Sequence, residues 1–145
     1  MKIANIMSSD VQIVSPTDTI QAAAKKMKDA DVGFLPVGEN DKLVGMLTDR
    51  DIALRAVANG KNPKKTMVRD VMTEKVLYCV EDDEVEAAAE NMAELQIRRL
   101  PIVDANKRLV GIVSIGDIAF RCDASTAGDT LEGVCKPNGD HRPTA

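Results

Sequence analysis

An internal repeat constrains the fold of this chain more than any other feature of its sequence. Residues 45–51 read GMLTDRD, and residues 111–117 read GIVSIGD. Both stretches contain a glycine, two apolar residues, a hydroxyl residue and, three positions after the hydroxyl, an aspartate. Further matching pairs precede them at a constant offset: Met7 with Met72, Asp18 with Asp83, Met27 with Met92, and Leu35-Pro36 with Leu100-Pro101. The sequence therefore predicts two similar halves.

Each half has the same predicted order of elements, β-α-β-β-α. The first helix of each half follows an aspartate, Asp18 or Asp83, that stands three residues before a Gln or Glu and resembles a capping box. The spacing of apolar residues predicts helices at 20–27, 49–59, 85–92 and 115–122, and strands at 11–14, 33–37, 43–47, 76–80, 97–103 and 109–113. The expected fold class is α+β.

The repeat also predicts the domain organisation. We expect a first repeat at residues 1–60, a linker at 61–67 and a second repeat at 68–122. A repeat of about 55 to 60 residues with few large side chains is too small to be stable alone, so the two repeats should pack together. Residues 123–145 are rich in Gly, Pro, Asp and Thr, which predicts a flexible C-terminal tail.

Composition excludes several classes of partner. Aromatic residues make up only 2% of the 145 residues, so the core is aliphatic and base stacking on aromatic rings is not expected. The net charge of −4 disfavours general binding to nucleic acid or to anionic membranes. No apolar run reaches the length of about 18 residues that a membrane span needs, and the N-terminus lacks the apolar core of a signal peptide. A cytoplasmic protein is expected.

No catalytic or metal constellation is visible in the sequence. The single histidine, His141, lies in the tail without a nucleophile nearby, and no Gly-rich phosphate loop is present, so an enzyme is not expected. Cys79 lies in an apolar run and is predicted to be a core residue. Cys122 and Cys135 with His141 supply three potential zinc ligands but no fourth, so we expect no metal. A small zinc or redox protein remains an alternative.

The repeated turn has two chemical interpretations. Thr48 with Asp51, and Ser114 with Asp117, match a capping box at the start of a helix, which alone explains both residue types. Alternatively, the free N–H groups of the helix start suit a phosphate, and the aspartate suits the vicinal hydroxyls of a ribose. The sequence leaves both interpretations open, although the recurrence of the turn in both halves favours a site.

These features together resemble a tandem pair of CBS domains, also called a Bateman module. The resemblance rests on the family motif G-h-h-[ST]-x-x-D (h is apolar) at 45–51 and 111–117, on the Ala-rich first helices and on the Leu-Pro pairs, and it covers residues 1–122. It implies two β-α-β-β-α repeats packed with pseudo-two-fold symmetry. It also implies adenosine-containing ligands in clefts between the repeats.

The resemblance assigns roles to residues around each turn. Asp51 and Asp117 would hold the ribose, and Thr48 and Ser114 would contact phosphate or ribose. The residues that would line the adenine are Met46, Ile112, Ile13 and Tyr78.

Arginines differ between the halves. Arg98 and Arg99 precede the second Leu-Pro pair, where the family often has a basic residue that reaches phosphate, while Gly33 and Phe34 take the same places in the first half. Arg50 lies inside the first turn. Surface salt bridges are the alternative role for each arginine. This asymmetry predicts two unequal sites.

The expected function is that of a sensor module without a required cofactor. It would bind AMP, ADP, ATP, NAD or S-adenosylmethionine as a regulatory ligand and signal by conformational change to an unidentified effector protein. The resemblance implies a homodimer, with the second helices as candidate dimer surfaces; membrane and nucleic-acid partners are not expected. The alternative is a ligand-free structural or dimerisation scaffold.

Overall fold

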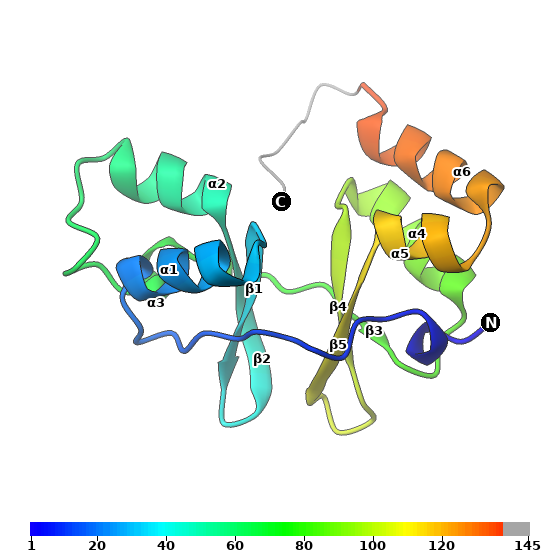
Figure 1. The fold of residues 1–145 in the computed structure, drawn as a ribbon, viewed down its shortest axis with the longest axis horizontal. Coiled ribbons are helices and arrows are strands. Elements are labelled where there is room, and N and C mark those ends of the chain that lie inside the picture. Colours follow the sequence, from blue (N-terminus) through cyan, green and yellow to red (C-terminus); the bar gives the residue numbers. More distant parts are fainter. Residues whose placement is uncertain (138–145) are drawn as a thin grey trace. The chain divides into compact units, whose positions relative to one another are not determined.

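The structure combines helices and strands, as the predicted α+β class requires (Figure 1). The structure is a computed structural model that describes residues 1–137. Its elements are η1 (Ile3–Asn5), α1 (Ile20–Ala30), β1 (Phe34–Glu39), β2 (Lys42–Thr48), α2 (Asp49–Asp51), η2 (Ile52–Val57), α3 (Val68–Val71), β3 (Cys79–Val80), α4 (Val85–Leu95), β4 (Arg99–Val103), β5 (Leu109–Ser114), α5 (Ile115–Arg121) and α6 (Ala124–Cys135).

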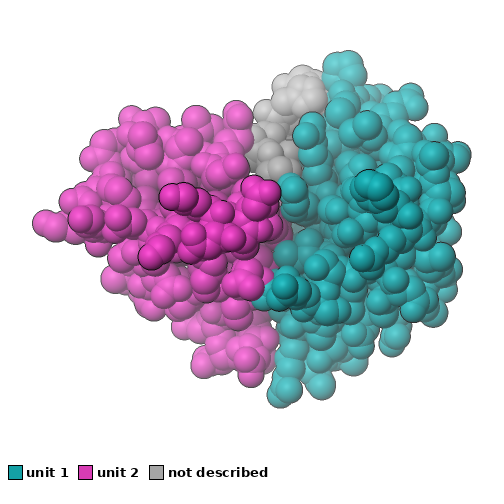
Figure 2. Space-filling model, viewed as in Figure 1, with its two compact units in different colours: residues 1–11, 77–144 teal, residues 12–76, 145 magenta. Residues whose placement is uncertain are grey.

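The chain forms two compact units whose boundaries differ from those of the sequence repeats (Figure 2). One unit comprises residues 12–76; the other joins residues 1–11 to residues 77–137. Each unit is therefore completed by the short segment that begins the sequence repeat of the other unit. The backbone N–H of Ile3 donates to Asp83 (2.9 Å), and that of Val68 donates to Asp18 (2.8 Å). The predicted boundaries describe the repeated sequence, whereas the folded units exchange these leading segments.

The unit of residues 12–76 is built on an antiparallel hairpin of β1 and β2. Asn40 and Asp41 both have positive φ, which suits the tight turn between right-handed twisted strands. Val14 bridges to Val37 on the β1 side of the hairpin, and Thr73 bridges to Met46 on the β2 side. Helix α1 covers one face, and the core residues are Val14, Ile20, Ala23, Met27, Leu35, Val37, Leu47, Ala56, Val68 and Val71.

The other unit has a three-stranded sheet in the order β3-β4-β5. Strand β3 runs parallel to β4, and β4 is antiparallel to β5. Ser8 extends this sheet by bridging to Ile112, as Thr73 does to Met46 in the first unit. The buried apolar core is Ile3, Ile6, Cys79, Val85, Ala88, Ala89, Met92, Leu100, Ile102, Val113, Ile118, Ala127 and Val134, which confirms the predicted core position of Cys79.

The glycine of each repeated turn has a packing role. A Cβ on Gly45 would lie 2.7 Å from Sδ of Met72, and a Cβ on Gly111 would lie 2.6 Å from Sδ of Met7. These distances are shorter than van der Waals contact, so only glycine leaves room for the leading segment to cross the strand. The repeated methionines and glycines of the sequence therefore form one contact in each unit.

Several local predictions were wrong. The strand expected at residues 11–14 is reduced to the bridge at Val14, and the strand expected at 76–80 is confined to β3. The cap of α1 is Thr19, whose Oγ1 accepts from the N–H of Ala22 (3.1 Å). Asp18 and Asp83, which were expected to cap the first helix of each half, stabilise the turns before these helices instead. The carboxylate of Asp18 accepts from the backbone N–H of Ser15 (2.9 Å), and that of Asp83 accepts from the backbone N–H of Val80 (3.0 Å).

The C-terminal region also departs from its prediction. Residues 124–135 were expected to be flexible but form α6, which packs on α4 and α5 and buries Ala127, Thr130 and Val134. Asp123 caps this helix by accepting from the N–H of Thr126 (2.6 Å). The buried residues recur at intervals of three and four, a helical period that the polar and Gly-rich composition obscured. The remainder of the predicted tail, residues 138–145, lies outside the described residues.

No helix within residues 1–137 is both long enough and apolar enough to cross a membrane.

Candidate functional site

The first repeated turn is a closed capping box at the end of β2. Oγ1 of Thr48 accepts from the N–H of Asp51 (3.0 Å), and Oδ2 of Asp51 accepts from the N–H of Thr48 (3.1 Å). Both residues are buried. The strand ends here because the hydroxyl and the carboxylate satisfy N–H groups that have no partner in the strand or in the first helical turn.

The second turn repeats this geometry at the end of β5. Oγ of Ser114 accepts from the N–H of Asp117 (3.1 Å), and Oδ2 of Asp117 accepts from the N–H of Ser114 (2.8 Å). Both residues are half-buried. The capping interpretation is therefore correct for both turns, and in each aspartate it uses Oδ2 and leaves Oδ1 to other partners.

The two Oδ1 atoms differ in their surroundings. Nε of Arg55 lies 3.8 Å from Oδ1 of Asp51. Arg121 stands in the same place relative to Asp117, four residues later, but forms no ion pair with it in the part of the chain that the structure describes. Oδ1 of Asp117 is thus the carboxylate oxygen more readily reached by an external hydroxyl donor.

The charge state of Asp51 reflects opposing effects. Burial raises the pKa of Asp51, and it outweighs the hydrogen bond from the backbone of Thr48 and the nearby Arg55 guanidinium, which both lower that pKa. The neighbouring Asp49 carboxylate contributes a smaller increase. The first turn therefore holds a carboxylate that is harder to ionise than an ordinary aspartate.

Two of the residues predicted to line an adenine, Met46 and Ile112, occupy equivalent positions on β2 and β5. Met46 pairs with Pro36 and precedes Leu47, a core residue whose side chain points to the opposite face of the sheet. Ile112 pairs with Pro101 in the same way. Their backbone groups are already used: Met46 exchanges two hydrogen bonds with Thr73 (2.9 and 2.8 Å), and Ile112 exchanges two with Ser8 (3.0 and 2.8 Å). Only their side chains remain for a ligand.

The other two residues predicted to line the adenine, Ile13 and Tyr78, are more exposed than Met46 and Ile112. Ile13 has 43% and Tyr78 40% of its surface exposed. Cδ1 of Ile13 would lie 3.5 Å from a Cβ on Gly38, near the hairpin turn, whereas Thr48 pairs with Phe34 at the other end of β1. The structure therefore does not bring Ile13 next to the capping box.

The arginines occupy different positions around the turns. Arg99 opens β4 and pairs in register with Ser114, which brings it to the second turn. Arg98 is exposed, and its carbonyl accepts from the N–H of Ile115 (3.1 Å). Arg50 is exposed on α2. In the first unit, Phe34 takes the place of Arg99 and pairs with Thr48. Strand register thus brings Arg99 beside the second capping box, while Arg50 lies within the first one at an exposed helix position.

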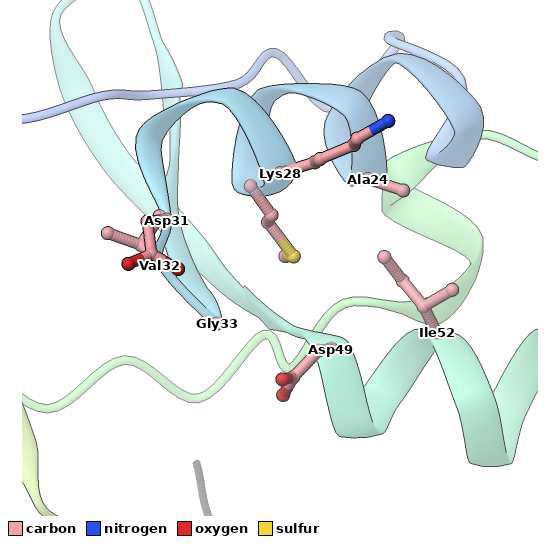
Figure 3. A pocket seen from close by; sticks show the side chains of 8 residues that line it. Ala24, Lys28, Asp31, Val32, Gly33, Asp49 and Ile52 are labelled. Atoms are coloured by element: carbon pink, nitrogen blue, oxygen red, sulfur yellow. The ribbon is translucent and has the colours of Figure 1, made fainter.

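Asp49, which the sequence analysis did not single out, lies beside the first turn. A pocket of about 370 Å³ opens there, lined by Ala24, Met27, Lys28, Asp31, Val32, Gly33, Asp49 and Ile52 (Figure 3). A Cβ on Gly33 would lie 2.8 Å from Oδ2 of Asp49, so the glycine makes room for this carboxylate. The second repeat has Arg98 and Ile115 at these positions. This difference between the repeats is the feature of the sequence that could have pointed to Asp49.

The cysteines form no metal centre within residues 1–137, where no group of three candidate ligands comes together. Cys122 is half-buried, Cys135 is exposed at the end of α6, and His141 lies outside the described residues. The expectation that the protein needs no metal remains a prediction. Cys79 is buried, burial raises the pKa of its thiol, and Asn91 donates to its Sγ (3.2 Å).

Comparison with known proteins supplies the family. The CBS domain model matches residues 3–57 and 68–123. The CBS domain-containing protein YhcV of Bacillus subtilis (strain 168) is 44% identical over 137 residues, which cover 94% of this chain and 96% of YhcV.

Solved structures agree with this match. The crystal structure of Hypoxic Response Protein I with two coordinated zinc ions is 35% identical, with a TM-score of 0.77 over 83% of this chain and 98% of that one. The CBS domain pair of protein MJ0100, in complex with 5′-methylthioadenosine and S-adenosyl-L-methionine, is 32% identical, with a TM-score of 0.72 over 83% of this chain and 94% of that one. The chain therefore belongs to the CBS domain family and carries two CBS domains.

Proposed function

We propose that this protein is a non-catalytic regulatory module that binds an adenosyl ligand at the repeated turns. The observation that carries the proposal is the second turn, where Asp117 keeps Oδ1 available beyond its capping bond and Arg99 lies opposite Ser114. A carboxylate oxygen accepts ribose hydroxyls, and a guanidinium with a helix N-terminus suits a phosphate. The complex of the MJ0100 domain pair with two adenosyl compounds supports this ligand class.

The two turns are proposed to prefer different ligands. The second turn has Arg98 and Arg99 nearby, which favours the phosphates of AMP, ADP, ATP or NAD. The first turn has Gly33 and Phe34 at the equivalent positions, and the carboxylate of Asp49, which lies beside Gly33, would repel a phosphate. An adenosyl ligand without phosphate, such as S-adenosylmethionine, suits the first turn better.

Calorimetric titration with AMP, ADP, ATP, NAD and S-adenosylmethionine tests this function. The Asp117→Asn variant keeps an amide oxygen that can accept from the N–H of Ser114, but it loses the negative charge. It is expected to keep its melting temperature within a few degrees and to bind AMP at least about tenfold more weakly, because a hydrogen bond to a charged group is lost. The matched Asp51→Asn variant should leave AMP binding at the second turn unchanged. Equal AMP affinity in wild type and Asp117→Asn would refute the ribose assignment.

A ligand-free scaffold is the second candidate function, because both capping boxes are complete without any ligand. Under this alternative none of the five compounds would produce heat or raise the melting temperature at millimolar concentration. Mass spectrometry of a freshly purified, denatured sample distinguishes the two functions independently. A co-purified stoichiometric adenosyl compound would support the sensor, and its absence together with flat titrations would support the scaffold.

Signalling to an effector protein, assembly as a homodimer and a cytoplasmic location are parts of the same proposal. The second helices carry exposed apolar side chains that fit a protein interface, with Phe120 on α5 92% exposed and Val57 on η2 65% exposed.

A further inference from the structure

Arg55 makes contacts that neither the capping box nor ligand binding explains. It lies on η2, four residues after Asp51, and its Nη1 donates to the carbonyls of Val71 (3.2 Å) and Met72 (3.1 Å). Its Nε lies 3.8 Å from Oδ1 of Asp51. A guanidinium carries five N–H donors in a planar fork, so one side chain can contact both the carboxylate and the two carbonyls.

The two carbonyls belong to the segment that crosses β2. Val71 is the last residue of α3, so its carbonyl has no acceptor role inside that helix. Met72 follows it and packs over Gly45. Thr73, the residue after Met72, exchanges two backbone hydrogen bonds with Met46. Arg55 therefore ties Asp51, the last residue of α2, to the only backbone pairing that holds residues 72–73 on the edge of β2 within the described residues.

The second unit provides a natural comparison. Arg121 occupies the position equivalent to Arg55, and Met7 and Ser8 occupy the positions of Met72 and Thr73. In the described part of the chain Arg121 donates to neither residue, and it forms no ion pair. The same arginine position thus makes the connection in one unit only.

We propose that Arg55 is a positioning residue that couples the carboxylate of Asp51 to residues 71–73, so that a change at Oδ1 of Asp51 alters how firmly this segment is held on β2. Insofar as it concerns a ligand, the coupling rests on the proposed function, because a ribose hydroxyl would donate to the oxygen that Arg55 faces. The part of the chain that responds to the first turn is then residues 71–73, which lie shortly before the boundary between the two units at residues 76 and 77.

Hydrogen exchange in the unliganded protein tests the coupling without any ligand. The reporters are the amides of Met46 and Thr73, whose hydrogen bonds join the segment to β2. Arg55→Gln is expected to raise their exchange rates about tenfold, because two charge-assisted hydrogen bonds are lost. Asp51→Asn should raise the same rates several-fold, since the neutral amide no longer attracts Arg55. The double variant should exchange no faster than Arg55→Gln alone, because Asp51 acts through Arg55.

Two further variants make the result specific. Arg121→Gln is the matched control and should leave the Met46 and Thr73 amides unchanged. Arg55→Lys keeps the charge but loses the fork, so it should fall between wild type and Arg55→Gln. Unchanged exchange in Arg55→Gln, or additive effects of Asp51→Asn and Arg55→Gln, would overturn the proposal.

A ligand measurement separates this proposal from the proposed function. If S-adenosylmethionine binds at the first turn, Arg55→Gln should lower its affinity several-fold, whereas Arg121→Gln should not. Equal affinity in wild type and Arg55→Gln would overturn the coupling. If no adenosyl compound binds to the wild type, the proposed function fails, and the exchange rates of the unliganded variants still decide whether Arg55 couples Asp51 to residues 71–73.

Discussion

Single residues at the repeated turns have a structural role in the caps and, in the proposed function, a second role in ligand binding. In each turn the hydroxyl and one carboxylate oxygen complete a capping box, and the other carboxylate oxygen is not needed for the cap. Structure and ligand binding can therefore use the same aspartate through different atoms. The aspartates differ in their environment, because Asp51 is buried beside Arg55 while Asp117 is half-buried.

The burial of Asp51 predicts a pH-dependent stability. Its folded pKa lies above the ordinary value of 3.8, so the folded state binds this proton more tightly than the unfolded state. Wild-type stability should therefore fall as pH rises through 3.8 towards the folded pKa, and Asp51→Asn should escape this loss. Urea unfolding of both proteins from about pH 3 to about pH 6 measures the difference in the free energy of unfolding. The difference should move in favour of Asp51→Asn with rising pH, and a constant difference would contradict the assignment.

At the level of elements, close backbone packing explains the glycines of the motif. Replacement of Gly111 by Ala should destabilise the protein by about 1–3 kcal/mol, because the new Cβ would overlap Met7 and the carbonyl of Ser8. Gly116→Ala is the control, since its Cβ would meet nothing closer than 3.4 Å, at Oγ of Ser114. Thermal unfolding followed by circular dichroism compares the two variants. A similar melting temperature for both would show that the segment adapts.

Helix α6 provides a matched pair of glycines on one element. A Cβ on Gly133 would lie 2.5 Å from Cβ of Ala93 on α4, whereas a Cβ on Gly128 would meet nothing within 4 Å. Gly133→Ala should therefore loosen the packing of α6 on α4 and lower the melting temperature. Gly128→Ala should stabilise the protein by about 0.5–1 kcal/mol, through the better helix propensity of alanine. If both substitutions stabilise, α6 does not pack as the structure indicates.

The elements also show what the sequence could predict. Two hairpins, two Ala-rich helices and both capping boxes were predicted because local spacing determines them. The exchange of leading segments was not, since the bond from Ile3 to Asp83 depends on tertiary packing that no local pattern encodes. The Arg55 contacts were missed for the same reason. Among the site residues, the pairing of Arg99 with Ser114 follows from strand register, whereas the pocket beside Asp49 became visible only in three dimensions.

At the scale of the whole molecule, the proposed homodimer can be tested through one exposed aromatic side chain. Phe120 is almost fully exposed on α5, which is unusual for the only large aromatic side chain of that helix. If the second helices form a dimer, Phe120→Glu should weaken self-association at least about tenfold, because the burial of an aromatic side chain is lost and a charge must be desolvated. Sedimentation velocity over a concentration series measures this. Leu131→Glu, on α6, is the control and should not change the association, and a monomeric wild type would refute the dimer.

The exchange of leading segments has a consequence for the order in which the protein is made. Residues 12–76 form one unit from continuous chain, so all of this unit has been synthesised while most of the other unit is still to be made. Residues 1–11 emerge before this unit but belong with residues 77–137, and they must wait for several seconds at ordinary rates of synthesis. The newborn chain therefore carries Ile3 and Ile6 exposed during that interval, although both are buried in the finished protein.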